Sequence, residues 1–180
     1  MHNPPVVKID INLDIQKFID ISAKLYVSYK TWGLHNQLSV TSRYAFPDDT
    51  NKSSRLSGSC GSLTKLKIKA KDEDFKYLNP EFIDLYPLIS AIEATTNRKI
   101  CRLLFRNLLS KTNVSYHKDS AEQRVHFVID TTENNFFIVD DRLYRMSEIG
   151  GVYLLNTNIK HTAVNADYSR DRLHLVGTLC

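Results

Sequence analysis

A histidine and an aspartate with one residue between them, His117 and Asp119, form the tightest local group of potential metal ligands in the sequence. Side chains at positions i and i+2 of an extended segment point to the same side, so the imidazole and the carboxylate can converge on one ion. The spacing alone is a weak signal, because roughly a third of chains this rich in histidine should contain it by chance. The alternative interpretation is a surface pair at the end of a strand.

A second histidine, His161, begins the segment HTAVN in the later, strand-rich part of the chain. A jelly-roll topology would bring it beside His117 and Asp119. Two histidines and one carboxylate leave coordination positions open on Fe(II), which suits chelation of a keto acid and binding of oxygen. A structural zinc site would be closed by protein ligands, preferably cysteines, and no cysteine lies near this group in the sequence.

Several predicted strands carry cationic side chains between apolar neighbours. A buried cation is costly unless an anion meets it. A dicarboxylate bound between two sheets would satisfy such side chains, because arginine binds a carboxylate through two parallel hydrogen bonds; the alternative is salt bridging to acidic residues at strand ends. Strand alternation groups Arg102 with Arg106, Arg124 with His126, and Arg172 with His174.

The composition is typical of a globular domain, with 42% hydrophobic and 24% charged residues. The net charge of +4 is mild and the basic residues are scattered, so we expect no nucleic-acid partner and interpret the lysines from Lys65 to Lys71 as a solvated strand face. No membrane helix and no signal peptide is predicted, which favours a cytoplasmic protein. Three widely spaced cysteines indicate reduced thiols without a disulfide framework.

Helices are predicted in the first half of the chain. Apolar spacing indicates an amphipathic helix over residues 13–29. Asn79, followed by proline and glutamate, starts a second helix that should run to about residue 96, with Pro87 disturbing or kinking it. Residues 46–62 are rich in Pro, Asp, Asn, Ser and Gly and are interpreted as a long loop, either functional or disordered.

Short apolar segments separated by turn signals follow after about residue 96. They cover residues 100–109, 125–129, 136–139, 152–155 and 173–176. The predicted fold class is α+β, mainly β: a double-stranded β-helix (jelly roll, cupin-like) with N-terminal buttressing helices. We expect one domain, with residues 1–98 helical or mixed and residues 99–180 forming the core that carries the metal site.

The run from Tyr116 to Leu179 resembles the aspartyl/asparaginyl β-hydroxylase-like branch of the 2-oxoglutarate- and Fe(II)-dependent oxygenases, which also includes hydroxylases of free proline. The stretches that carry the resemblance are YHKDSAEQRVHFVID, FFIVDDRLYRMSEIGGVYLLNTNIKHTAVN and DRLHLVGTL. Their ordered combination is fairly specific, whereas each motif alone is not. Over the N-terminal 95 residues the resemblance is vague.

The resemblance implies a role for each matching residue. Iron would be held by His117, Asp119 and His161, and the cofactors would be Fe(II), 2-oxoglutarate and oxygen. For 2-oxoglutarate, the distal carboxylate would meet Arg172 and the metal-proximal carboxylate His126, with Arg124 nearby and facing co-substrate or substrate.

Two departures from the family pattern bear on these roles. The interval from His161 to Arg172 is one residue longer than usual, which makes Arg170 a rival for the carboxylate, although Arg172 is favoured because it lies directly at the apolar strand that begins at Leu173. Asn165 is expected to fix a turn rather than to act in chemistry. Asp119 is present, whereas animal aspartyl β-hydroxylases lack it, and a complete set of ligands argues against a halogenase.

The implied reaction is hydroxylation of an unactivated carbon of an amino acid, either free or within a peptide. Arg102, Arg106 and the loop over residues 46–62 could line the substrate pocket. Two alternatives remain open at this point: a non-catalytic jelly-roll protein that binds a metal or small molecule, and a zinc or manganese hydrolase of cupin type.

Overall fold

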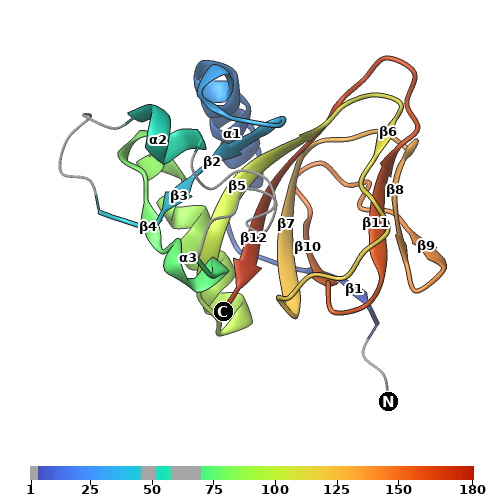
Figure 1. Cartoon of the computed structure of the whole chain (residues 1–180). Helices are drawn as coiled ribbons and strands as arrows, with labels where there is room; N and C mark the ends of the chain where they lie inside the picture. The colour runs from blue at the N-terminus through green and yellow to red at the C-terminus, as the bar shows by residue number, and fades with distance from the viewer. Residues whose placement is uncertain (1–3, 46–51, 58–69) are drawn as a thin grey trace.

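Two antiparallel β-sheets face one another, and the helices lie on the outer side of the larger sheet (Figure 1). This computed structural model describes residues 4–45, 52–57 and 70–180. The six-stranded sheet has the order β1-β10-β7-β12-β5-β2 and the four-stranded sheet the order β6-β11-β8-β9; a small third sheet pairs β3 with β4. The predicted fold class, a mainly β jelly roll with buttressing helices, is confirmed.

The strands of the larger sheet are β1 (Val6–Ile9), β2 (Gln37–Ser39), β5 (Ile100–Leu108), β7 (Gln123–Asp130), β10 (Val152–Asn156) and β12 (Arg172–Leu179). The smaller sheet contains β6 (Thr112–Asn113), β8 (Asn135–Val139), β9 (Arg142–Tyr144) and β11 (His161–Asn165), and the third contains β3 (Thr41–Ser42) and β4 (Tyr77–Leu78). All five predicted strand segments are present. The edge strands β1 and β2 come from the N-terminal part, which the sequence had placed outside the jelly-roll core.

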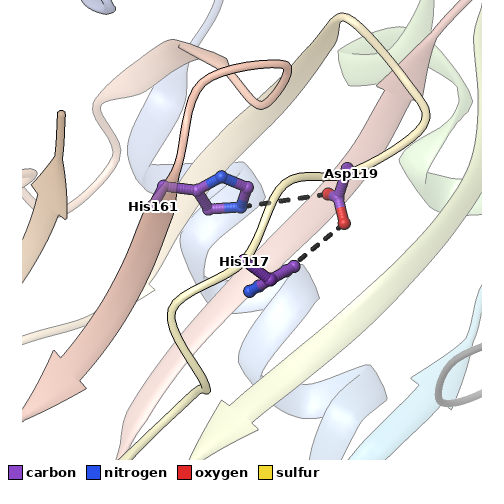
Figure 2. Close-up of side chains that lie close together, drawn as sticks. All are labelled: His117, Asp119 and His161. Carbon is purple, nitrogen blue, oxygen red and sulfur yellow. Dashed lines mark ion pairs between the residues drawn. The ribbon is translucent and has the colours of Figure 1, made fainter.

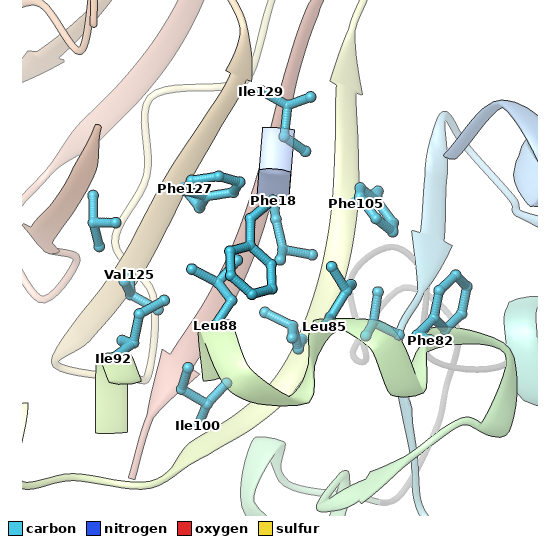
Figure 3. Close-up of a cluster of buried hydrophobic side chains, with 14 of the residues drawn as sticks. Phe18, Phe82, Leu85, Leu88, Ile92, Ile100, Phe105, Val125, Phe127 and Ile129 are labelled. Carbon is cyan, nitrogen blue, oxygen red and sulfur yellow. The ribbon is translucent and has the colours of Figure 1, made fainter. Parts of the chain in front are cut away.

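Alternation along β7 and β12 divides the larger sheet into two faces. Leu173 and Leu175 point outward into a core with Phe18 of α1 and Leu88 of α3 (Figure 3). Residues directly opposite on paired strands share a face, and the register pairs Val176 with His126, Thr178 with Arg124 and His174 with Arg106. The polar side chains of these strands therefore occupy the inner face, toward the smaller sheet.

The two predicted helices form close to their expected bounds. Helix α1 spans Ile15–Tyr29, and its first turn is capped by the Asp14 carboxylate, which accepts a hydrogen bond from the Lys17 amide at 3.3 Å. The second helix is divided into a 3-10 segment, η3 (Pro80–Leu85), and α3 (Tyr86–Thr96). Pro87 lies in the first turn of α3, where its missing N–H costs no intrahelical hydrogen bond, and the non-helical residue is Phe82 in the preceding 3-10 segment. The predicted disturbance in the first half of this helix is therefore present, but the kink lies at Phe82 and not at Pro87. No helix in the described ranges is long and apolar enough to cross a membrane.

Part of the predicted loop over residues 46–62 is helical. Residues 52–57 form the short helix α2 (Lys52–Ser57). Its Arg55 is only 1% exposed and binds both carboxylate oxygens of Glu81, each at 2.9 Å. This buried ion pair fixes the segment, which local composition could not reveal. The rest of that loop, and residues 65–69 of the lysine stripe, lie outside the described residues. Two further 3-10 turns are η1 (Lys30–Trp32) and η2 (Asp72–Asp74).

The prediction of reduced thiols is wrong for two of the three cysteines. Cys101 and Cys180 form a disulfide, with their Cα atoms 6.2 Å apart. The antiparallel pairing of β12 with β5 places Thr178 opposite Cys101 and so brings the two sulfur atoms together. Their separation of 79 residues gave no local signal for this contact. Cys60 lies outside the described residues.

Candidate active site

His117, Asp119 and His161 converge at the start of β11 (Figure 2). One ligand atom from each residue lies within 4.8 Å of the others. His117 Nε2 is 3.3 Å from one oxygen of Asp119, and His161 Nε2 is 4.0 Å from the other. His161 begins β11, whereas the His117–Asp119 pair lies between β6 and β7, outside any full strand. An isolated antiparallel bridge between His117 and His161 joins the two segments.

Backbone carbonyls orient both histidines for metal binding. His117 Nδ1 lies 2.5 Å from the carbonyl oxygen of Ser115, and His161 Nδ1 lies 2.9 Å from that of Ile159. Each Nδ1 therefore carries the proton and donates it to a carbonyl, which leaves the Nε2 lone pair free for an ion. Burial lowers the pKa of His161, and the opposing effects of Ile159 and Asp119 do not reverse this, so the ring is neutral at pH 7.

Asp119 is held as a carboxylate. Its backbone amide donates to the carbonyl of Thr157 at 2.9 Å, and its side chain accepts a hydrogen bond from Arg124 Nε at 2.5 Å. Burial alone would raise the pKa of Asp119, but Arg124 and the two histidines outweigh it and lower that pKa below its usual value. The carboxylate is thus ionised and oriented before an ion arrives.

Asp72 is a site residue that the sequence did not reveal. It comes from η2, and its carboxylate accepts hydrogen bonds from Thr178 Oγ1 at 2.8 Å and from Arg102 at 3.1 Å. The guanidinium of Arg124 also lies 3.6 Å from it. Arg124 therefore links Asp72 to the metal ligand Asp119. An acidic turn far upstream carries no local sign of this role.

The two arginines proposed to line a substrate pocket have different surroundings. Arg102 is 6% exposed, has a positive φ of 35°, binds Asp72 and stacks on Phe75. It lies at an irregularity in the pairing of β5 with β12, so alternation alone does not relate it to Arg106. Arg106 lies opposite His174 on the inner face.

A buried cation for which the described residues supply no counter-ion lies on the inner face of β12. Arg172 is 3% exposed, and within the described part of the chain its Nε and Nη1 atoms have no hydrogen-bond partner. Its guanidinium lies 4.8 Å from the centre of the Phe137 ring. Burial, with a further contribution from Arg106, lowers the pKa of Arg172 to about 9. Such a group fits an anionic ligand, since a carboxylate would satisfy both its charge and its donors.

Arg170, the rival for this role, lies on the surface. Its side chain is 56% exposed and pairs with Asp130 at 2.7 Å. Asn165 fixes the turn between β11 and β12, in which Arg170 lies: its side-chain amide donates to the carbonyls of Leu108 and Arg170, each at 2.9 Å. The expected role of Asn165 in fixing a turn fits this geometry, and Arg172 alone of the two arginines points inward.

His126 interacts electrostatically both with Arg172 and with His161. It is 4% exposed, and its Nε2 atom has no partner among the described residues. Burial lowers the pKa of His126 well below its usual value, with further lowering by Arg172 and, among others, by His161. The imidazole of His126 is therefore neutral, and it lies within electrostatic reach of both Arg172 and His161. The residues that the resemblance assigned to 2-oxoglutarate thus lie on the inner face of the larger sheet, and His126 is electrostatically coupled both to Arg172 and to His161 of the candidate metal site.

Comparison with solved structures finds the same fold in proteins of very low sequence identity. A Pseudomonas putida prolyl-4-hydroxylase matches with a TM-score of 0.51 and 9% identity, over 97% of this chain and 91% of that chain. HygX from Streptomyces hygroscopicus, with nickel and 2-oxoglutarate bound, matches with a TM-score of 0.51 and 11% identity, over 96% and 81% of the two chains. A weaker match, which carries no conclusion about the fold, is an oxidoreductase of the 2OG-Fe(II) oxygenase family from Burkholderia pseudomallei: it aligns over 57% of each chain, with 15% identity and a TM-score of 0.47.

Sequence comparison gives the family. No curated protein matches the chain. The sequence profile of the aspartyl/asparaginyl beta-hydroxylase family matches residues 37–179, which include every ligand and cationic residue described above. The chain therefore belongs to the aspartyl/asparaginyl beta-hydroxylase family of Fe(II)- and 2-oxoglutarate-dependent oxygenases, as the sequence resemblance predicted.

Proposed function

We propose that this protein hydroxylates an unactivated carbon of an amino acid, either free or as a residue of a peptide, using Fe(II), 2-oxoglutarate and oxygen. The observation that carries the proposal is the presence of His117, Asp119 and His161 together with a buried arginine, Arg172, for which the described part of the chain supplies no anion. A metal site alone would not need such an arginine. A dicarboxylate could chelate the metal with one end and bind Arg172 with the other.

The residues have distinct tasks in this proposal. Nε2 of both histidines and the Asp119 carboxylate hold the ion, and Arg124 keeps that carboxylate ionised and oriented. Arg172 binds the distal carboxylate of 2-oxoglutarate, and His126 donates to the carboxylate next to the metal. The bound Fe(II) and 2-oxoglutarate supply oxidation of the substrate by oxygen, with release of succinate and carbon dioxide.

The substrate class rests on the family and on the charge at the site. Arg102 and Arg106 are candidates to meet a substrate carboxylate, although Asp72 already pairs with Arg102. A cytoplasmic location and the absence of a nucleic-acid partner stay predictions.

An anaerobic titration tests the proposal. The metal-free protein is titrated with Fe(II) and then with 2-oxoglutarate, while visible absorption is followed. A weak charge-transfer band that needs both additions, and that His161→Ala abolishes, is the expected result. Absence of the band, together with tight zinc binding or no metal binding, would refute the iron assignment.

Turnover separates the enzyme from a non-catalytic jelly-roll protein. After admission of oxygen, an oxygenase converts 2-oxoglutarate into succinate, slowly even without its substrate and faster with the correct amino acid or peptide. A binding protein would show the absorption band without forming succinate.

A further inference from the structure

A second histidine, His174, lies beside His126 inside the jelly roll and has no role in the function proposed above. It is 0% exposed and stands on the inner face of β12, two residues after Arg172. Its ring is nearly perpendicular to that of His126, at 81°, with the centres 5.6 Å apart. The Nδ1 atoms of the two rings are 3.4 Å apart and share a hydrogen bond.

This hydrogen bond couples the tautomers of the two rings. One Nδ1 must carry a proton and the other must present a lone pair, because two N–H groups or two lone pairs would repel. Burial lowers the pKa of both His126 and His174 well below the usual value, and Arg172 lowers both further, so each ring is neutral and carries one proton. The ring that donates from Nδ1 therefore has a lone pair at Nε2, and its partner has an N–H at Nε2.

Both Nε2 atoms are buried without a partner among the described residues. The pair thus presents one donor and one acceptor toward the interior. Only a donor at His126 Nε2 can bind a carboxylate, since a lone pair there would face the anion. The lone pair that then remains on His174 Nε2 is compatible with the positive charge of Arg172, which acts electrostatically on this ring.

We propose that His174 is a positioning residue that donates its Nδ1–H to His126 and thereby fixes His126 as the Nε2–H tautomer that binds the metal-proximal carboxylate of the oxo acid. This inference rests on the proposed function. The alternative is that His174 only fills space beside Phe137, whose ring centre is 6.4 Å away.

Two substitutions at this position separate the roles. Asparagine places its amide nitrogen where His174 has Nδ1 and can keep the hydrogen bond to His126. Glutamine places its polar atoms near the Nε2 position and lacks a donor at the Nδ1 position. Both are uncharged, and both leave a polar side chain in the same buried place.

Binding of 2-oxoglutarate is measured by calorimetry without oxygen, with Mn(II) in place of iron. We expect His174→Gln to weaken binding by about ten- to a hundredfold, as for loss of a hydrogen bond to a charged group. His174→Asn should bind within a few-fold of the original protein. Equal weakening in both folded variants would mean that His174 acts only by packing, and would overturn the inference while leaving the proposed function intact. No binding by the unaltered protein would instead refute the proposed function.

Nitrogen NMR gives a direct readout that packing would not change. In the unaltered protein with Zn(II) and 2-oxoglutarate, two-bond proton–nitrogen correlations should show His126 protonated at Nε2 and His174 at Nδ1. The reverse assignment would overturn the inference even if the variants fail to fold.

Discussion

Replacing Arg172 with methionine should make the metal-free protein more stable and at the same time abolish its binding of 2-oxoglutarate. The side chain is 3% exposed, and its pKa is lowered to about 9 by burial and by Arg106. A lowered arginine pKa means that the folded state disfavours the charged form. Relative to the ordinary value of 12.5, the penalty is about 5 kcal/mol, at about 1.4 kcal/mol for each tenfold change in the protonation equilibrium.

A methionine of similar length removes this penalty and keeps much of the packing against Phe137. Replacement of even a buried ion pair by apolar residues is often neutral or stabilising by about 1 to 4 kcal/mol, and for Arg172 the described residues supply no anion to offset its burial. At this chain length each kcal/mol corresponds to a rise of about 2–4 °C in melting temperature. The same change removes charge-assisted hydrogen bonds to the distal carboxylate, each worth about 1.5–3 kcal/mol, so binding should weaken by at least about a hundredfold.

Thermal unfolding with and without ligand measures both effects. With Mn(II) and 2-oxoglutarate at about a hundred times its dissociation constant, the original protein should gain about 2.7 kcal/mol. Arg172→Met should start from a higher melting temperature and show almost no gain from 2-oxoglutarate. Arg170→Met is the matched control, because that exposed side chain pairs only with Asp130 within the described residues and its loss should change stability by less than about 1 kcal/mol. The reasoning would be refuted by an Arg172→Met protein that is several kcal/mol less stable and still gains from 2-oxoglutarate.

Other predictions concern the supports of the site. Backbone amides that hydrogen-bond to Asp167 lower the pKa of this carboxyl far below its usual 3.8. The ionised carboxylate therefore stabilises the fold above pH 3.8, and this stabilisation is lost as the pH falls further. The difference in free energy of unfolding between the original protein and Asp167→Asn should shrink when unfolding is measured at increasingly acid pH. Asp72→Asn should lower the free energy of unfolding in urea by about 1–3 kcal/mol, because the buried Arg102 loses its charged partner, whereas Glu73→Gln, at the exposed position beside it, should have little effect. Cys101→Ser should lower the free energy of unfolding by up to about 4 kcal/mol under oxidising conditions, and the difference should vanish in reductant; an unchanged difference would contradict a disulfide at this position.

The arginines Arg124 and Arg172 differ in the acidic partners that the described residues supply. Arg124 is balanced by Asp119 and Asp72, whereas Arg172 has no anion among the described residues. In the proposed function, the cation beside the candidate metal ligands is neutralised within the protein, and Arg172 is left to pair with the co-substrate. Part of the burial penalty of Arg172 would then be recovered when a carboxylate binds.

Local sequence determined much of this protein because strands and helices have fixed side-chain periods. Alternation alone separated Arg172 and His174 from Leu173 and Leu175, and these pairs do occupy opposite faces of β12. Arg172 was favoured over Arg170 because it directly precedes the apolar strand that begins at Leu173; alternation cannot distinguish two residues that are two positions apart. The pair His117 and Asp119 was visible because the two residues are close in the sequence, although the structure places them outside any full strand.

Tertiary structure decided what no local period can encode. The bridge that joins His161 to His117, the contact of Asp72 with Arg124, and the pairing of Cys101 with Cys180 each depend on strand register and on where a connecting segment returns. The hydrogen bond between His126 and His174 has the same origin, since it spans two paired strands. Side-chain direction along one strand follows from covalent geometry, whereas contacts between distant segments follow from how the sheets and helices bury their apolar faces together.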